Sequence, residues 1–241
     1  NTFIFTQQLR IMRSESIRLM KAEVWFMGSN MIRKKRTLIY FIEAAQEITD
    51  EEGAENLTIR KVAARAGYNS ATLYHYFDNL NQLKMYASLR YVSQYNKEFF
   101  ESAKNLRTER EKFSLMWDIF IRHSVQHPEA FASVFMSRSH DDTLSGIFSQ
   151  YNELFPEDSI SPVGTVYTFD QYASLVERNL TAILQIQKEE NLNNPNLAVI
   201  NDLMIYFYTG ILQDLLNSDA AGRKVLEGKL SKGIHHLLAQ I

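Results

Sequence analysis

The segment Asn69–Phe77, with the sequence NSATLYHYF, combines small hydroxyl-bearing residues with three aromatic rings and a histidine. Ser70, Ala71 and Thr72 present hydroxyl and methyl groups of the kind that contact base edges in a DNA major groove. Residues 74–76 carry rings whose polar groups can reach phosphates and whose faces can pack on sugars. Three adjacent helical residues fan over more than half of a helix circumference, so they cannot all be buried against one core. The segment is therefore predicted to be a short helix that contacts DNA.

Residues on either side could support this helix. Leu73 and Phe77 are four residues apart and would form its protein-facing side. Thr58 and Arg60 stand at the start of the preceding helix, where free backbone N–H groups and the helix dipole attract a phosphate. The basic run 33–36, with the sequence RKKR, is placed where flexible cations can reach the DNA backbone or minor groove.

The elements that must position these residues are all predicted to be helices, because glycine and proline are scarce and most periodic segments exceed strand length. A helix over 31–52 is followed by a short one with Thr58 as N-cap and Gly67 as its C-terminal stop. Asn69 caps the next short helix, and a long helix follows over 79–104. Two short helices joined by a tight turn, between longer ones, form a helix-turn-helix. The remaining helices are predicted at 109–126, 128–138, 141–155, 167–191, 196–217 and 222–240.

The sequence LTIRKVAARAGYNSATLYHYFDNLNQL, residues 57–83, resembles the DNA-binding domain of the TetR-like (tetracycline-repressor-like) transcriptional regulators. The resemblance implies an all-α protein, with a three-helix DNA-binding domain before a helical bundle for effector binding and dimerisation. It assigns phosphate contacts to Thr58 and Arg60, and a structural role to Ala63, Ala66, Gly67, Leu73 and Phe77. One position departs from the family pattern. The lysine that often opens the fourth helix is replaced by Leu80, and Lys84, one turn later, is the expected substitute.

The predicted domains follow from this resemblance. Residues 1–30 are an unassigned N-terminal extension, which is either an extra amphipathic helix or a segment ahead of the first domain. Residues 31–78 are the DNA-binding domain, and residues 79–241 are the effector-binding and dimerisation domain. The predicted DNA contacts are Arg33, Lys34, Lys35, Arg36, Thr58, Arg60, Asn69, Ser70, Ala71, Thr72, Tyr74, His75, Tyr76 and Lys84.

Charge is distributed unevenly along the chain. The formal net charge is −2, but residues 31–90 hold nine basic and seven acidic residues, whereas residues 91–241 hold thirteen basic and nineteen acidic ones. The acidic part would repel a polyanion, so any contact with double-stranded operator DNA should fall in the first third. No apolar run approaches the ~18 residues that span a bilayer, and no secretory signal is recognisable. A cytoplasmic protein with no membrane partner is expected.

By the same resemblance, the C-terminal bundle should bind a small hydrophobic effector and form a homodimer. The acidic balance of this part favours a neutral or cationic effector. The candidate effector-binding residues are Trp117, Phe120, His123, Phe131, Phe135, Tyr167 and Tyr172. The dimer should form through the helices at 167–191 and 196–217, by a four-helix interface. Its candidate residues are Leu175, Leu180, Ile183, Leu203, Phe207, Ile211 and Leu215.

Two other functions remain as alternatives to a ligand-relieved repressor. One is a helical protein-binding adaptor that has lost DNA binding, which Leu80 and Asp78 would favour. The other is a metal-binding helical bundle, because His123 and His127 have the i, i+4 spacing of paired metal ligands. No third ligand is obvious in the sequence, so no metal or other cofactor is expected. The sequence has no cysteine and no recognisable catalytic motif, and an enzyme is not expected.

Overall fold

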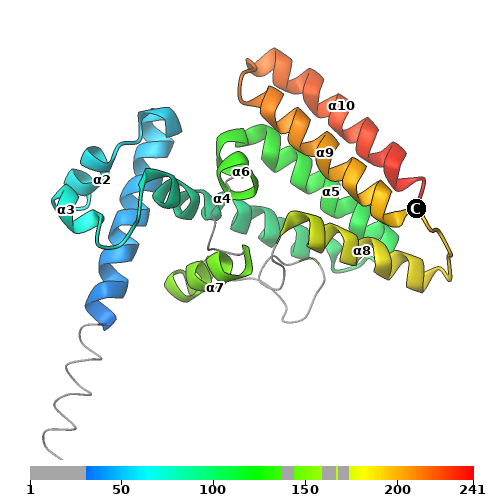
Figure 1. Cartoon of the computed structure of the whole chain (residues 1–241), viewed down its shortest axis with the longest axis horizontal. Helices are drawn as coiled ribbons and strands as arrows, with labels where there is room; N and C mark the ends of the chain where they lie inside the picture. The colour runs from blue at the N-terminus through cyan, green and yellow to red at the C-terminus, as the bar shows by residue number, and fades with distance from the viewer. Residues whose placement is uncertain (1–30, 137–143, 159–166, 168–173) are drawn as a thin grey trace, which may run out of the picture.

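The computed structural model of the chain describes residues 31–136, 144–158, 167 and 174–241, and every regular element in those ranges is helical. The first helix covers 31–52 and is followed by the 3₁₀ turn η1 (Ala54–Asn56) and by α2 (Ile59–Arg65). The short helix α3 (Ser70–Leu73) precedes the long α4 (Leu80–Ala103). Figure 1 shows helix 31–52, α2 and α3 as one group at one end of the molecule, from which α4 runs into the rest. We call helix 31–52, η1, α2 and α3 the head.

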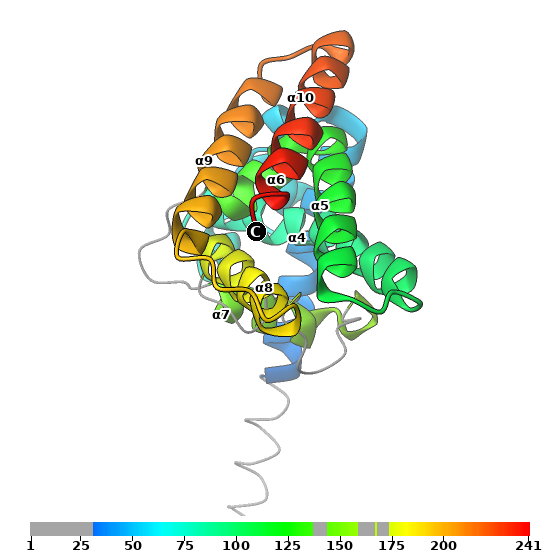
Figure 2. The same cartoon turned by 90° about the vertical axis from the view of Figure 1, so that its right-hand side faces the viewer.

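The larger part, which we call the body, is a bundle of antiparallel helices. Its elements are α5 (Glu109–Gln126), α6 (Pro128–Phe135), α7 (Leu144–Leu154), the 3₁₀ turn η2 (Pro156–Asp158), α8 (Leu175–Glu189), α9 (Leu197–Leu215) and α10 (Ala220–Leu238). In the bundle, α5 packs against α4 and α10, and α9 packs between α8 and α10, as Figure 2 shows from the side. The all-α prediction is therefore confirmed for the described residues. No helix among them is long and apolar enough to cross a membrane.

The α2–α3 turn has the local chemistry that the sequence predicts. The Thr58 hydroxyl accepts from the Lys61 N–H at 3.3 Å and caps α2. Gly67 has a φ of +77°, a backbone conformation that glycine adopts without a Cβ penalty. The Tyr68 N–H, just beyond it, returns to the Ala63 carbonyl at 2.8 Å, closing a Schellman motif. These contacts fix the angle at which α3 leaves α2.

The third helix is shorter than the two turns that the sequence predicts. It is regular only over Ser70–Leu73, and residues 74–76 continue as a tighter turn with i→i+3 hydrogen bonds. Asn69 caps its start, accepting from the Thr72 N–H at 2.8 Å. Leu73 and Phe77 are 0% and 2% exposed, as expected for its protein-facing side. The change of pitch keeps Phe77 in the core while it alters the directions of the rings at 74–76.

One aromatic cluster holds the head together. The ring of Phe41, fully buried on helix 31–52, lies 5.2 Å from the Tyr68 ring, 5.8 Å from the Tyr76 ring and 6.4 Å from the Phe77 ring. Phe77 in turn meets Tyr86 of α4 at 5.9 Å. The rings meet in tilted or edge-on geometries, which aromatic pairs prefer. This cluster joins α3 to both helix 31–52 and α4.

Candidate DNA interface and ligand-binding body

The surface formed by α3 and its preceding turn presents the small and aromatic residues together. Ala71, Tyr74 and His75 are exposed, with Tyr74 at 57%, and Ser70 and Thr72 are half-buried. The Thr72 hydroxyl donates to Asn69 Oδ1 at 3.1 Å, so its remaining lone pairs stay available as acceptors. Tyr76 differs from its two neighbours because it is half-buried against Phe41. Its ring supports the head, and only its outer part faces solvent.

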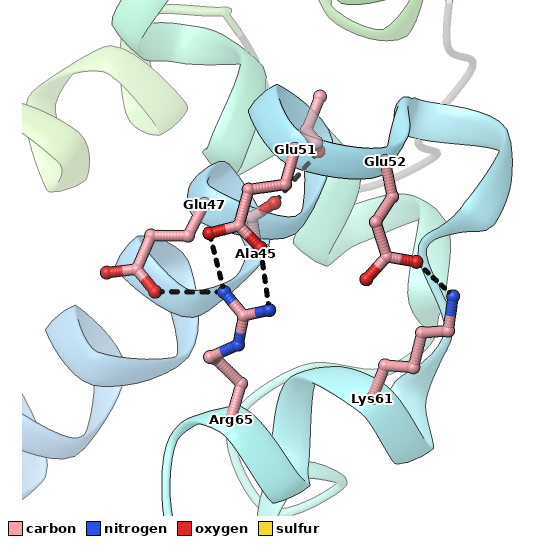
Figure 3. A network of polar contacts seen from close by, with 7 residues as sticks. Ala45, Glu47, Glu51, Glu52, Lys61 and Arg65 are labelled. Carbon is pink, nitrogen blue, oxygen red and sulfur yellow. Dashed lines mark hydrogen bonds and ion pairs between the residues drawn. The ribbon is translucent and has the colours of Figure 1, made fainter.

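The cations of α2 are divided between two faces. Figure 3 shows Lys61 and Arg65 directed at the acidic end of helix 31–52. Lys61 Nζ lies 2.5 Å from Glu52 Oε2, and Arg65 binds Glu51 at 2.9 Å and Glu47 at 3.3 Å. The hydrogen bond from Arg65 lowers the pKa of the Glu51 carboxyl. These exposed, solvent-screened pairs join α2 to the first helix but add little to stability.

Arg60 is the third cation of α2 and, unlike Lys61 and Arg65, is not directed at helix 31–52 by an ion pair. It is exposed and makes no ion pair with any residue in the part of the chain that the structure describes. It stands beside Thr58 at the N-terminal end of α2, where backbone N–H groups attract an anion. From the sequence alone, Arg60 cannot be distinguished from Lys61 and Arg65, because the carboxylates that pair with Lys61 and Arg65 lie on another helix.

The basic run 33–36 lies within the first described turns of helix 31–52 and is exposed. The Arg36 guanidinium donates to the Tyr40 hydroxyl at 3.2 Å. The Thr37 hydroxyl donates to the Arg33 carbonyl one turn earlier, at 3.0 Å, and Thr37 is buried at 4% exposure. The four cations therefore directly precede Thr37, which is buried in the head.

The start of α4 differs from the family pattern in structure as well as in sequence. Leu80 is half-buried against the core, so the residue at this position supports packing. Asn79 caps α4 by accepting from the Gln82 N–H at 3.0 Å, and the Gln82 side chain accepts from the Asp78 N–H at 2.8 Å. Lys84 lines a cavity between helix 31–52, α4 and α6. Its predicted DNA contact remains a prediction.

In the body, the candidate effector residues form a close-packed aromatic cluster. Phe120 lies 5.2 Å from Phe131, 5.3 Å from Phe135 and 5.6 Å from Trp117, measured between ring centroids. Trp117, Phe120 and Phe131 are 0% exposed. Tyr167 is also buried, and its hydroxyl donates to the Glu109 carboxylate at 2.9 Å. Tyr172 lies outside the described residues.

Arg178 of α8 lies beside this cluster, and the sequence analysis did not identify it. It is fully buried, and its guanidinium lies 5.5 Å from the centre of the Phe120 ring. Its Nη1 donates to the Tyr95 hydroxyl at 3.3 Å. A charged residue inside an apolar helix face is the signal that could have identified it, because full burial of arginine is rare without partners.

A chain of buried polar groups joins the aromatic cluster to α8 and α9. The Trp117 indole donates to Asn179 Oδ1 at 3.0 Å, and Asn179 Nδ2 donates to Asn201 Oδ1 at 2.9 Å. Asn201 then donates to the Val176 carbonyl at 3.3 Å. Buried polar groups must be paired to avoid a desolvation penalty. Sliding one of the three helices α5, α8 and α9 along another would break these hydrogen bonds, so the bonds fix their relative positions.

His123 does not pair with His127 as a metal site would require. Its Nε2 lies 2.8 Å from Glu98 Oε2, whereas the His127 ring stacks on Tyr91 with centroids 4.2 Å apart. Within the described ranges there is no group of three metal-ligating side chains. His123 Nδ1 is buried and has no hydrogen-bond partner among the described residues.

The structure corrects part of the predicted dimer face. Leu175, Ile183 and Leu215 are 5%, 0% and 0% exposed, so they pack inside their own subunit and are not available to a partner. Phe207 turns towards α10, where a Cβ at Gly233 would lie 2.2 Å from its ring. Leu180 and Ile211 are half-buried, and Leu203 is 49% exposed.

A different apolar stripe is exposed on α8 and α9. On α9, Val199, Leu203, Tyr206 and Gly210 are spaced four, three and four residues apart, which places them on one face. They are exposed, with Tyr206 at 73%. On α8, Val176 and Leu184 are exposed two turns apart. We call these six residues the outer face; their helical spacing is visible in the sequence, but their exposure is not.

Residues 41–83 match the family model of bacterial regulatory proteins of the tetR family. The head of this chain therefore carries a DNA-binding domain of the tetR type. A helix-turn-helix transcriptional regulator of Staphylococcus aureus (strain MRSA252), SAR2658, is 21% identical to the TetR-like chain over 166 residues, covering 69% of this chain and 89% of that protein.

Two solved structures have the same fold as the TetR-like chain. The TetR-family repressor FadR of Thermus thermophilus, in complex with lauroyl-CoA, superposes with a TM-score of 0.54 at 13% identity, covering 84% of this chain and 93% of that one. RolR in complex with resorcinol superposes with a TM-score of 0.52 at 14% identity, covering 87% and 95%. The TetR-like architecture thus extends from the head through the body.

Proposed function

We propose that this regulator is a repressor that binds palindromic operator DNA as a homodimer and releases it when a small hydrophobic effector binds the body. In this proposal residues 31–78 form the DNA-binding domain and residues 79–241 the effector-binding and dimerisation domain, and the protein acts in the cytoplasm. The observation that carries the proposal is the α3 surface, where Ala71, Tyr74 and His75 are exposed on a helix anchored by buried Leu73 and Phe77.

The contacts of the head divide by type. The residues at 70–72 would meet base edges, while Tyr74 and His75 would meet the backbone on either side. Arg60 and the run 33–36 would bind phosphates, since they are exposed cations near the same domain surface. Lys61 and Arg65 are excluded from this role because helix 31–52 already engages them.

Dimerisation would use the outer face of α8 and α9. One head offers few contacts, so useful affinity at cellular salt requires two heads on two half-sites, with a spacing set by the dimer. Gly210 supports this assignment. A glycine inside a helix costs ~1 kcal/mol relative to alanine, and among the described residues no atom outside its own helix backbone would contact a Cβ there. A closely approaching partner helix would account for it.

The effector would bind near the aromatic cluster of the body. The two structural relatives hold lauroyl-CoA and resorcinol, which carry an acyl chain and an aromatic ring respectively. The cluster around Phe120 offers a chemically similar apolar wall. An effector would act only to the extent that it binds the DNA-released arrangement more tightly than the DNA-bound one.

A salt titration tests the proposal. The purified chain is titrated against DNA from upstream of its own coding sequence and against random DNA of equal length, by fluorescence anisotropy at several salt concentrations. We expect the upstream DNA to bind more tightly and its log affinity to fall linearly with log salt. A flat response to salt, or equal affinity for both DNAs, would contradict the repressor and favour the protein-binding adaptor.

Two substitutions in and after α3 should have different effects. Thr72→Ala removes a base-facing hydroxyl and should change preference at one base pair by ~1–3 kcal/mol. Tyr74→Ala removes a backbone contact and should weaken operator and random DNA alike. Thr72→Ser is the matched control, because it keeps the hydroxyl and removes only the methyl. Binding to a panel of single-base operator variants measures the difference, and unchanged DNA binding by both alanine variants would show that α3 is wrongly assigned.

A further inference from the structure

His123 of α5 is buried, at 8% exposure, and lies at the edge of the aromatic cluster of the body. Its ring stands edge-on to the Tyr95 ring, with the two centroids 6.2 Å apart. Tyr95 in turn meets Phe120 edge-on at 5.2 Å, and Phe120 contacts the other rings of the cluster. His123 therefore places two ring nitrogens beside a largely apolar group of side chains.

The two ring nitrogens of His123 have different surroundings. Nε2 lies 2.8 Å from Glu98 Oε2 of α4. Nδ1 is buried and makes no hydrogen bond within the part of the chain that the structure describes. Most buried polar atoms in folded proteins are paired, because an unpaired one has lost its hydrogen bond to water without a replacement. Nδ1 is thus a position at which a ligand group would restore a lost hydrogen bond.

Glu98 determines which role Nδ1 plays in such a bond. Burial alone would raise the pKa of Glu98, but hydrogen bonds from Arg122 and His123 outweigh it and lower the pKa, so the carboxylate is ionised at neutral pH. A carboxylate only accepts hydrogen bonds, so Nε2 carries the proton that lies between the two groups. In the neutral imidazole, Nδ1 is then the nitrogen with the unused lone pair. The missing partner of Nδ1 is therefore a hydrogen-bond donor.

Buried donors of the same bundle have partners of their own. The Trp117 indole donates to Asn179 Oδ1 at 3.0 Å. The Ser124 hydroxyl, on the residue after His123, donates to the Phe120 carbonyl at 2.7 Å. Neither group is placed to pair with Nδ1 without giving up a buried hydrogen bond, so a donor from outside the chain would not compete with them.

The surroundings of His123 favour a neutral, aromatic donor. An ammonium group would lose far more hydration than a hydroxyl on entering a site lined by rings. An aromatic ring also forms tilted or edge-on pairs of the kind that Tyr95 and Phe120 already form. A phenol combines the two features, since its hydroxyl is a donor attached directly to an aromatic ring.

Burial of Nδ1 means that a ligand reaches it only when the packing around His123 opens. His123 contacts α4 through Tyr95 and Glu98, and α4 runs from the head into the body (Figure 1). A molecule bound to Nδ1 therefore favours an arrangement that differs from the closed one at the contact between α4 and α5. Such a difference in affinity between two arrangements is what an effector requires.

We propose that the body binds a small phenol whose hydroxyl donates to His123 Nδ1 and whose ring packs on the neighbouring aromatic side chains. The proposal rests on the function proposed above and specifies the chemical class of the effector. Glu98 acts as a positioning residue, because it holds the proton on Nε2 and leaves Nδ1 as the acceptor.

Calorimetry on the full chain tests the hydrogen bond with phenol and 4-propylphenol, each compared with its methyl ether. The ether keeps the ring and the oxygen but has no hydrogen to donate. We expect the phenols to bind about fivefold to tenfold more tightly than their ethers, as one hydrogen bond to a buried acceptor predicts. Failure of both phenols to bind, or a bound phenol that is no tighter than its ether, would overturn the proposal.

Three variants test whether the preference for phenol over ether depends on Nδ1. His123→Phe keeps a ring without nitrogens and should abolish the preference. Glu98→Gln, at a half-buried position, presents an amide that can donate to Nε2 and move the proton to Nδ1, so the preference should fall to about twofold. His127→Gln is the matched control, since His127 lies one turn later and stacks on Tyr91. A preference that survives both His123→Phe and Glu98→Gln, or that His127→Gln removes equally, would contradict the assignment.

An operator titration distinguishes this proposal from the repressor function. Operator affinity is measured by anisotropy with and without 4-propylphenol, for the wild type and for His123→Phe. We expect the phenol to weaken wild-type binding about fivefold or more, and binding by the variant much less. An equal change in both proteins would contradict an effector role for this site. Absence of specific operator binding by the ligand-free wild type would contradict the repressor function, whereas the calorimetric comparison would still decide the phenol site.

Discussion

Leu203→Glu is expected to dissociate the proposed dimer into monomers and to remove most of its operator affinity. Leu203 is half exposed at the centre of the outer face, between Val199 and Tyr206. In a twofold interface the substitution introduces two carboxylates into apolar surroundings. A buried like-charge arrangement costs several kcal/mol, so the dimer dissociation constant should rise at least ~100-fold. Analytical ultracentrifugation gives the oligomeric state, and anisotropy gives the operator affinity.

The control for this experiment is Val225→Glu. Val225 is also an exposed aliphatic residue, at 60%, but it lies on α10 outside the outer face. The Val225→Glu substitution introduces the same charge as Leu203→Glu and should leave both dimerisation and DNA binding unchanged. If Leu203→Glu and Val225→Glu sediment as the same dimer, the outer face is not the dimer interface.

Phe41→Ala is expected to destabilise the head enough to abolish DNA binding. The fully buried ring contacts Tyr68, Tyr76 and Phe77, which join α3 to helix 31–52. Removing a buried phenylalanine side chain costs ~3–5 kcal/mol, through lost burial and the cavity that remains. That loss is a large fraction of the ~5–15 kcal/mol that stabilises a typical domain. Urea unfolding followed by circular dichroism measures the change.

Phe41→Leu is the companion variant, because it keeps most of the apolar volume and removes the ring contacts. It should fold with a smaller loss of stability and retain part of the operator affinity. An unchanged urea midpoint for Phe41→Ala, with unchanged operator affinity, would show that the aromatic cluster does not position α3.

Local chemistry is what the sequence predicts well in this chain. The N-caps of α2 and α3 are Thr58 and Asn69, and Gly67 ends α2, as their residue types favour. These contacts are predictable because they involve groups only a few positions apart in the sequence. The bounds of α4, predicted as 79–104 and observed as Leu80–Ala103, follow from the same local signals. The short α3 was predicted too long, since its last residues tighten where Phe77 enters a core built from other helices.

Tertiary partners account for the remaining differences. On α9, apolar residues lie on more than one face, so the pattern alone did not separate buried Leu215 from exposed Leu203. Likewise, Lys61 and Arg65 are indistinguishable from Arg60 until the acidic end of helix 31–52 is placed beside α2. In each case the missing information is which surface of a helix another helix covers.

The hydrogen bond between Trp117 and Asn179 provides an intrinsic optical probe. The chain has two tryptophans, one of which, Trp25, precedes residue 31. A variant that begins at residue 31 therefore carries a single indole, buried between Phe120 and Tyr208 and bonded to α8. Its emission wavelength and quenching would follow the separation of α5 and α8 without any attached dye. The proposed effector binding would thus be observable through one residue that contacts both the aromatic cluster and α8.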